Sequence, residues 1–274
     1  MDPDRIKLNR LYHDLAYLWP LVSPPEDYAE EAEYWRLALR ETLGPGRHHI
    51  LDLGVGGGHN LSHLTSDFDA TAVDISSKML AHSKRLNPSV KHIRGDMRSI
   101  RLGRKFEAVL IHDAISYMLT EDDLQATFVT AAAHLQPGGI LITTPDHFRE
   151  TFSAPYVDYA THSLGNAQFT YSEYADDPDP TDTTMRTIYV YFIQQHGHLR
   201  IELDRHVTGL FPKSTWARLM TEAGFKFEER LYHLGEEVVE YSMLVGKLQR
   251  PHTHEPERAG VPPGFHHGQP GPTA

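Results

Sequence analysis

The chain of 274 residues contains no cysteine. Disulfide bonds, thiolate ligands for zinc and thiol nucleophiles are therefore excluded, and several classes of enzyme are excluded with them. Long apolar runs are also missing, because no stretch approaches the roughly 18 consecutive apolar residues of a membrane-spanning helix. The first residues, Met-Asp-Pro-Asp, are acidic where a secretory signal is basic. We therefore expect a cytoplasmic protein without a membrane partner.

Positive charge is scarce as well. Lys and Arg total 26 against 37 for Asp and Glu, which gives a formal net charge of −11, and no strongly basic cluster interrupts this balance. A long polyanion such as DNA or RNA would meet net repulsion. The charge balance therefore favours a small molecule over a nucleic acid as the partner.

The first 47 residues are predicted to form a helical cap. Apolar residues from Ile6 to Trp19 follow helical spacing, and Pro20 is expected to end that helix. A second helical run extends from Glu26 to Leu43, where a Gly-Pro-Gly sequence stops it.

From His48 onward, short apolar strands alternate with amphipathic helices. This pattern is typical of a doubly wound α/β domain, in which helices cover both faces of a mostly parallel sheet. Ser76 and Thr120 are expected to cap two of the helices. Five strands are predicted, at His49–Leu53, Ala70–Asp74, Lys91–Arg94, Ala108–His112 and Ile140–Thr144.

The alternation stops after Pro145. Residues 146–209 are rich in Tyr, Phe and Thr, and period-two segments predict an antiparallel β insertion after the fifth strand. A further helix and two strands within residues 210–249 would complete a seven-stranded sheet together with residues 48–145. Residues 250–274 hold four histidines, but this segment is so rich in Pro and Gly that we expect a disordered tail and no metal site.

The β insertion carries a concentration of aromatic side chains. Such residues suit the wall of a pocket for a small organic molecule. They equally suit the interface of a homodimer, since antiparallel sheets with an exposed apolar face often pair across a two-fold axis. The sequence leaves both interpretations open for Phe148, Phe152, Tyr156, Tyr159, Phe169 and Tyr171.

A glycine-rich turn follows the first predicted strand. It places an acidic residue and three glycines in an acid-x-Gly-x-Gly-x-Gly frame, as Asp52, Gly54, Gly56 and Gly58. Glycine lets the chain turn sharply into the next helix and lets a ligand lie against bare backbone. A dinucleotide-binding Gly-x-Gly-x-x-Gly motif would need its third glycine at His59, which argues against a nicotinamide-dependent oxidoreductase.

This turn resembles the first motif of class I S-adenosylmethionine-dependent methyltransferases, a family with a Rossmann-like fold. The resemblance implies that Asp52 helps to orient the methionine part of the cofactor. It also implies that Asp74, at the end of the second strand, accepts both ribose hydroxyls, with Ile75 against the adenine. In Gly95-Asp96-Met97-Arg98, the side chain of Asp96 would accept a hydrogen bond from the adenine amino group, and the backbone of Met97 would lie beside the ring.

Further residues of the expected cofactor site are less specific. Asn60 begins the helix after the glycine-rich turn, and Met79 lies one helical turn beyond Asp74, where it could cover the adenine or pack in the core. Asp74 could instead serve the cap of the next helix, and Asp96 could cap its own loop. The order and spacing of the whole series still favour S-adenosylmethionine as the cofactor.

Over most of its length, the chain is similar to small-molecule N-methyltransferases that dimethylate amino groups of nucleotide-linked deoxysugars in natural-product pathways. The similarity includes residues 26–32, 95–98, 102–104, 134–139 and 206–211. It implies that an aromatic residue of the N-terminal segment lines the reaction centre, together with a polar residue after the fourth strand. These are Tyr12 or Tyr17, with His13 between them, and Tyr117, where the relatives often carry histidine.

Ligands gather at the carboxyl ends of parallel strands, so His112, Asp113 and Tyr117 are expected to border the reacting methyl group. Methyl transfer mainly requires alignment and exclusion of water, and an amine acceptor needs no strong base. A hydroxyl acceptor would need one, such as His112 or His13. The sequence predicts a methyltransferase for a small amine; an O- or carboxyl-methyltransferase and a non-catalytic cofactor-binding protein are the alternatives.

Overall fold

The computed structural model describes residues 3–164, 167–235 and 240–249, so the prediction for the tail of residues 250–274 lies outside the described part. Its centre is a seven-stranded sheet in the order β10-β11-β5-β4-β1-β2-β3. The first five strands pair in parallel, while β11 is antiparallel to both β5 and β10. This is the fold that the sequence predicts. The strands are β1 (His49–Leu53), β2 (Asp69–Asp74), β3 (Lys91–Arg94), β4 (Phe106–Ile111), β5 (Leu135–Thr143), β10 (Phe225–Tyr232) and β11 (Tyr241–Leu248).

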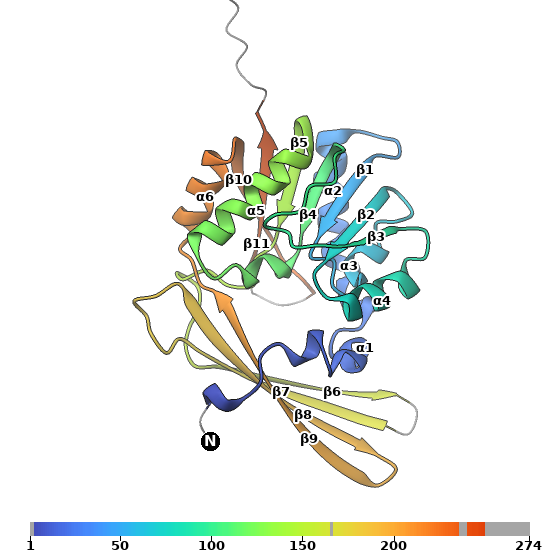
Figure 1. Cartoon of the computed structure of the whole chain (residues 1–274), viewed down its shortest axis with the longest axis vertical. Coiled ribbons are helices and arrows are strands. Elements are labelled where there is room, and N and C mark those ends of the chain that lie inside the picture. Colours follow the sequence, from blue (N-terminus) through green and yellow to red (C-terminus); the bar gives the residue numbers. More distant parts are fainter. Residues whose placement is uncertain (1–2, 165–166, 236–239, 250–274) are drawn as a thin grey trace, which may run out of the picture.

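Helices cover both faces of this sheet (Figure 1). Successive residues of a strand point to opposite faces. Ile50 therefore packs with residues of α2 and α3, whereas Leu51 packs with residues of α5 and α6. Ser76 and Thr120 cap α4 and α5, as predicted, by accepting the backbone N–H groups of Met79 and Asp123. The helices are α2 (Ala29–Leu43), α3 (His59–Ser62), α4 (Ser77–Leu86), α5 (Glu121–His134) and α6 (Lys213–Glu222).

The N-terminal segment differs from the prediction. The helix expected from Ile6 to Trp19 is absent; short 3₁₀ turns take its place, and Pro20 lies inside the helical turn α1 (Trp19–Val22), near its start. The cause is a tertiary contact, because the buried carboxylate of Asp204 accepts the backbone N–H groups of Arg10 and Leu11. The 3₁₀ turns are η1 (Pro3–Arg5), η2 (Arg10–Tyr12), η3 (Ala16–Leu18) and, before α2, η4 (Pro25–Tyr28).

A second sheet of four antiparallel strands lies below the carboxyl ends of the parallel strands, and the N-terminal segment passes between the two (Figure 1). Its strands are joined in the order β6-β7-β8-β9, and His196 and Gly197 form the two-residue turn between β8 and β9 with positive φ at both. The sequence did not reveal the edge strand β6. The strands are β6 (Tyr156–Leu164), β7 (Ala167–Asp176), β8 (Thr184–Gln195) and β9 (His198–Gly209).

No helix in the described part of the chain is long and apolar enough to cross a membrane. The 3₁₀ turn η5 (Asp113–Tyr117) follows β4 directly. It faces β9, so this turn brings the end of a parallel strand next to the four-stranded sheet. The space between these elements is where a ligand site is expected.

Candidate active site

A cavity of about 380 Å³ lies at the carboxyl ends of the parallel strands. Its wall is made by the glycine-rich turn, by the loops after β2, β3 and β4, and by the N-terminal segment. Most of the predicted site residues line it, although they come from five separate parts of the chain. They are Tyr12, His13, Asp52, Gly54, Gly56, Asn60, Asp74, Ile75, Asp96, Met97, His112 and Tyr117.

Backbone geometry requires glycine in the turn after β1. Gly54 has a φ of 81°, a left-handed conformation that favours glycine, and a Cβ there would lie 2.5 Å from the Cβ of Ala114. A Cβ on Gly57 would lie 2.0 Å from Nε1 of Trp19. The third glycine of the motif serves another purpose, because a Cβ on Gly58 would collide with Ser83 on α4. Gly58 therefore allows two helices to approach and does not line the cavity.

Asp52 lies at the base of the cavity with one carboxylate oxygen, Oδ1, that has no hydrogen-bond partner in the described protein. Burial raises the pKa of Asp52 to about 7; the negative charges of Asp74 and Asp113 add to this effect, and His112 opposes it. A buried carboxylate in this state is stabilised by a cationic group of a ligand. The position therefore fits the ammonium of an amino acid moiety.

Asp74 holds the glycine-rich turn in place. Its Oδ2 accepts the backbone N–H of Gly56 at 2.8 Å, and its Oδ1 accepts that of Ser76 at 2.7 Å. Burial raises the pKa of Asp74, and these two hydrogen bonds work against that shift. Each carboxylate oxygen can accept a second hydrogen bond, so the side chain can serve the turn and a hydroxylated ligand together. The neighbouring Ile75 presents an exposed apolar side chain to the cavity.

Asp96 is paired with the guanidinium of Arg98, which also contacts Asp123 at 2.8 Å. The hydrogen bonds from Arg98 lower the pKa of Asp96, so this carboxylate stays ionised near neutral pH. This pairing fits the alternative in which Asp96 caps its own loop, but Asp96 also lines the cavity. The methyl group of Met97 lies 2.6 Å from the position that a Cβ on Gly54 would take, so these two loops pack tightly.

Two residues considered from the sequence lie away from this cavity. Met79 is only 1% exposed and packs in a cluster with Leu15 and Phe169, so its position fits the core-packing alternative. Tyr17 is 52% exposed, and its hydroxyl accepts a hydrogen bond from Arg200. Of the two tyrosines considered for the reaction centre, Tyr12 therefore lines the cavity and Tyr17 does not.

His112 is held between two carboxylates. Its Nε2 lies 2.6 Å from Glu31, and its Nδ1 lies 3.1 Å from Asp113. Burial alone would lower the pKa of His112, but these carboxylates raise it well above its usual value. Both ring nitrogens therefore carry protons near neutral pH. A protonated imidazole cannot accept a proton, so the geometry does not suit the role of base that we considered for a hydroxyl acceptor.

Tyr12 and Tyr117 form a hydroxyl pair at the cavity, with 2.9 Å between their oxygens. Burial raises the pKa of both phenols well above the usual value, so both stay protonated. The Tyr117 hydroxyl also lies 2.6 Å from Nδ1 of His206, which in turn contacts Asp204. His206 and Asp204 were not predicted as site residues, although their spacing of two positions on one strand is enough to predict that they share a face.

Negative charge surrounds the hydroxyl pair. Asp113 lines the cavity, and both Asp113 and Asp146 raise the pKa of Tyr12. The protein atoms around Asp146, together with the negative charge of Asp113, raise the pKa of Asp146 to about 8, so this carboxyl is mostly neutral near pH 7. This part of the cavity favours a group on which positive charge develops.

The aromatic residues of the β insertion, for which the sequence left a pocket wall and an interface open, do not line this cavity. Phe148 and Phe169 are buried in two different hydrophobic clusters, and Tyr159 is 74% exposed. Trp19, to which the sequence pattern gave no role, lies in the N-terminal segment against the glycine-rich turn. Its position could not be predicted, because the segment was interpreted as one continuous helix.

Residues 50–139 match a family described as a methyltransferase domain. The chain is 30% identical over 218 residues to the dTDP-3-amino-3,4,6-trideoxy-alpha-D-glucopyranose N,N-dimethyltransferase of Streptomyces venezuelae, covering 79% of this chain and 89% of the relative. It is 29% identical over 219 residues to the dTDP-3-amino-3,6-dideoxy-alpha-D-glucopyranose N,N-dimethyltransferase of Streptomyces fradiae, covering 78% and 85%. Among solved structures, the sugar N-methyltransferase KedS8 from a Streptoalloteichus species superposes with a TM-score of 0.75 at 25% identity, covering 87% of this chain and 93% of KedS8.

Proposed function

This chain belongs to the class I S-adenosylmethionine-dependent methyltransferases of the amino-sugar type, and we propose that it methylates the amino group of a small, sugar-like molecule in natural-product biosynthesis. One observation carries the proposal: most of the predicted cofactor residues and the Tyr12–Tyr117 pair line the same cavity. The named relatives are N,N-dimethyltransferases of amino sugars, which supports an amine as the acceptor.

S-adenosylmethionine is the cofactor, and when bound it supplies a methyl group on a positively charged sulfur. We propose that Asp52 holds the ammonium of its methionine part, since Oδ1 of Asp52 has no partner within the described protein. Asp74 would accept the ribose hydroxyls. Ile75 and Met97 would lie against the adenine. The carboxylate of Asp96 would accept a hydrogen bond from the adenine amino group. The bare backbone of Gly54 and Gly56 leaves room for the methionine part, and Asn60 borders it.

An amine suits the reaction centre better than a hydroxyl does. The hydroxyls of Tyr12 and Tyr117 stay protonated, and so does His112, so none of them is an ionised base for a hydroxyl acceptor. A neutral amine already carries the lone pair that attacks. The carboxylate of Asp113 would stabilise the positive charge that moves onto nitrogen as the methyl group is transferred. The exposed His13 lies at the cavity wall and would contact the outer part of the acceptor.

Methyl-labelled cofactor, incubated with the purified protein and a panel of amino sugars, simple amines, alcohols and carboxylates, tests this proposal. We expect label and a mass gain of one or two methyl groups on an amine only. Methylated product from a carboxylate or alcohol, with none from any amine, would contradict the proposed amine acceptor and identify an oxygen acceptor instead.

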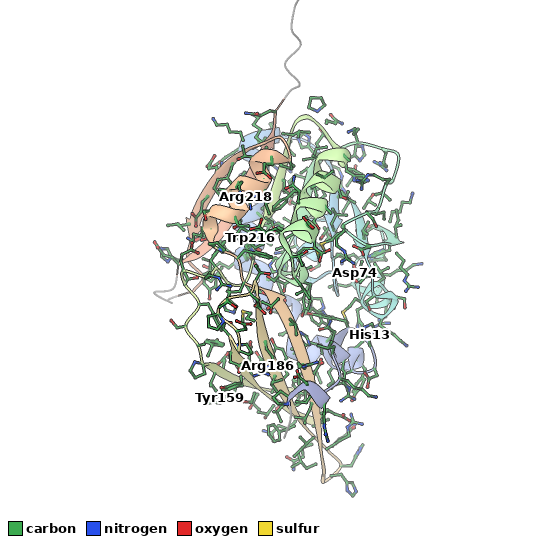
Figure 2. All side chains as sticks on the ribbon, turned by 60° about the vertical axis from the view of Figure 1, so that its left-hand side comes forward. His13, Asp74, Tyr159, Arg186, Trp216 and Arg218 are labelled. Carbon is green, nitrogen blue, oxygen red and sulfur yellow. The ribbon has the colours of Figure 1, made fainter. Side chains whose placement is uncertain are left out.

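We also propose that two copies of the chain pair through the outer face of the four-stranded sheet. Alternate positions on this face expose large apolar side chains, namely Val157, Tyr159, Tyr174 and Ile201. Figure 2 shows Tyr159 on the side of the sheet away from His13, so pairing there would leave the cavity open. Exposed apolar surface of this kind is typical of an interface. Sedimentation of the Tyr159→Glu/Ile201→Glu variant should show a monomer where the wild type is a dimer, and a monomeric wild type contradicts the pairing.

The partners in this proposal are thus the cofactor, the acceptor and a second copy, without a nucleic acid or a membrane. We propose the cytoplasm as the compartment, because the methyl donor is a cytoplasmic metabolite. Localisation of a tagged full-length chain by cell fractionation tests this point.

A further inference from the structure

A chain of hydrogen bonds leads from the cavity into the four-stranded sheet. The hydroxyl of Tyr12 lies 2.9 Å from that of Tyr117, which lies 2.6 Å from Nδ1 of His206. Nε2 of His206 lies 2.9 Å from Oδ2 of Asp204. The two tyrosines line the cavity, whereas His206 is 3% exposed and Asp204 is 0% exposed. The chain therefore has one end at the ligand site and one end in the protein interior.

The buried end fixes the direction of these hydrogen bonds. Asp204 already accepts the backbone N–H groups of Arg10 at 2.8 Å and Leu11 at 2.7 Å, so its carboxylate acts as an acceptor throughout. In the neutral form of the ring, Nε2 of His206 carries the hydrogen and donates it to Asp204, which leaves a lone pair on Nδ1. The Tyr117 hydroxyl donates to that lone pair. Tyr12 in turn donates to the oxygen of Tyr117, and the oxygen of Tyr12 keeps a free lone pair for a group in the cavity.

We propose that Asp204 and His206 are positioning residues that turn the Tyr12–Tyr117 pair into a proton acceptor for the amine. The inference rests on the proposed function. As the new nitrogen–carbon bond forms, the carbon–sulfur bond breaks with its electron pair left on sulfur, and the nitrogen becomes an ammonium. One N–H proton of the ammonium moves to Tyr12, the proton of Tyr12 moves to Tyr117, and that of Tyr117 moves to Nδ1 of His206. The resulting imidazolium stays beside Asp204 and returns the proton to water after the product leaves.

The relay matters because a methylated amine that stays protonated has no lone pair for a second methyl group. Acidic and aromatic side chains surround the relay. Asp113 and Asp146 face the tyrosines from the parallel-sheet domain, and the ring of Tyr189 lies 5.0 Å from that of His206 in an edge-to-face arrangement. Other titratable or charged groups close to the relay are Glu173, Tyr191 and Arg10.

A purely structural role of the same residues is the alternative. Asp204 also holds the N-terminal segment through its bonds to Arg10 and Leu11, so substitution of Asp204 would disturb the fold. Tyr117→Phe removes one hydroxyl and leaves the pair of His206 and Asp204 intact. His206→Gln keeps a polar side chain in the sheet but removes the ring nitrogen that would accept the proton. These two variants therefore separate proton transfer from folding.

The first experiment needs no acceptor. In full-length protein labelled with ¹⁵N-histidine, the signal of His206 is assigned as the one lost in His206→Gln. We expect a neutral ring with the hydrogen on Nε2, and an Nδ1 signal that moves toward that of an unbonded nitrogen in Tyr117→Phe. A hydrogen on Nδ1, or an Nδ1 signal that Tyr117→Phe leaves unchanged, would overturn the relay.

The second experiment measures methylation of an amine as a function of pH. His206→Gln should lower kcat by roughly 100-fold, the lower end of the range for general acid–base catalysis by one group, and should change the pH profile of kcat. The affinity for S-adenosylmethionine should stay within twofold. His198→Gln, an exposed histidine on the same strand, is the matched control and should leave kcat unchanged.

A bypass variant completes the test. Tyr117→His places an imidazole at the cavity itself, so adding His206→Gln in that background should cost less than threefold in kcat. Equal losses in both backgrounds, or a wild-type pH profile in His206→Gln, would show that His206 is only structural. A wild type that binds the cofactor but methylates no amine counts against the proposed function alone, because the ¹⁵N experiment tests the relay separately.

Discussion

The two halves of the cavity are built in different ways. On the cofactor side, Asp52, Gly54, Gly56 and Asp74 lie within one strand-turn-helix-strand unit, and their contacts are between near neighbours. On the acceptor side, Tyr12 contacts Tyr117 across 105 positions of sequence, and Tyr117 contacts His206 across 89. The cofactor side is therefore a local motif, whereas the acceptor side exists only when three distant segments have assembled.

The largest effect is expected from a side chain in the glycine-rich turn. Gly54→Val forces a branched side chain into a left-handed position with Ala114 2.5 Å from the new Cβ. We expect the affinity for S-adenosylmethionine to fall by more than roughly 100-fold, measured by calorimetry. Gly103→Ala is the matched control, because Gly103 has a similar φ of 66° with no atom within 4 Å. That variant should lose about 1 kcal/mol of stability and no affinity.

The next effect concerns the charge of Asp52. Its pKa of about 7 means that the carboxyl gains a proton as the pH falls through 7, so affinity for the cationic cofactor should weaken below that pH. Asp52→Asn should bind roughly 10- to 100-fold more weakly at pH 8 and without this pH dependence. Calorimetry between pH 6 and 8 checks both points, and equal pH dependence in the two proteins would contradict the assignment.

The same residue gives a stability prediction of the opposite sign. Because the folded-state pKa of Asp52 is raised, its contribution to stability is greatest at low pH and is lost as the pH rises through about 7. Asp52→Asn cannot ionise, so it should raise the Tm of the ligand-free protein at pH 8. The variant should also show a smaller rise in Tm when S-adenosylmethionine is added. A lower Tm without ligand would contradict the burial argument.

The next effect is on the acceptor side, where Tyr12 and Tyr17 form a natural pair of test and control. Tyr12→Phe removes the hydroxyl that contacts Tyr117 and that would receive the proton of the amine, so kcat for the amine should fall by roughly 100-fold, as in His206→Gln. Cofactor affinity should not change. Tyr17→Phe should leave both quantities unchanged, because Tyr17 lies outside the cavity; equal losses would contradict this difference.

The smallest effect should come from Met79. Met79→Leu conserves volume in a buried cluster, so stability should change by less than about 1.5 kcal/mol, and the affinity for the cofactor should not change. Calorimetry and thermal unfolding of one variant measure both. A marked loss of affinity would return Met79 to the cofactor site.

The difference between the local cofactor side and the assembled acceptor side explains which parts of the structure the sequence could predict. The strand ends that carry Asp52 and Asp74 follow from apolar runs and glycine spacing, which depend on neighbouring residues only. The helix expected from Ile6 to Trp19 failed because Asp204, nearly 200 positions away, binds the backbone N–H groups of Arg10 and Leu11 and holds the segment in short turns. His206 was not predicted as a site residue for the same reason, because only its contact with Tyr117 connects it to the cavity. A single sequence does not contain such pairings.

The most direct test of the account is a crystal structure of the protein with S-adenosylhomocysteine. The account predicts that the amino acid part of the ligand lies beside Asp52 and that its sulfur faces the Tyr12–Tyr117 pair, where the glycine-rich turn meets the N-terminal segment. A ligand bound outside this cavity, or bound inside it with the sulfur turned away from both tyrosines, would contradict the claim that the two halves form one reaction centre.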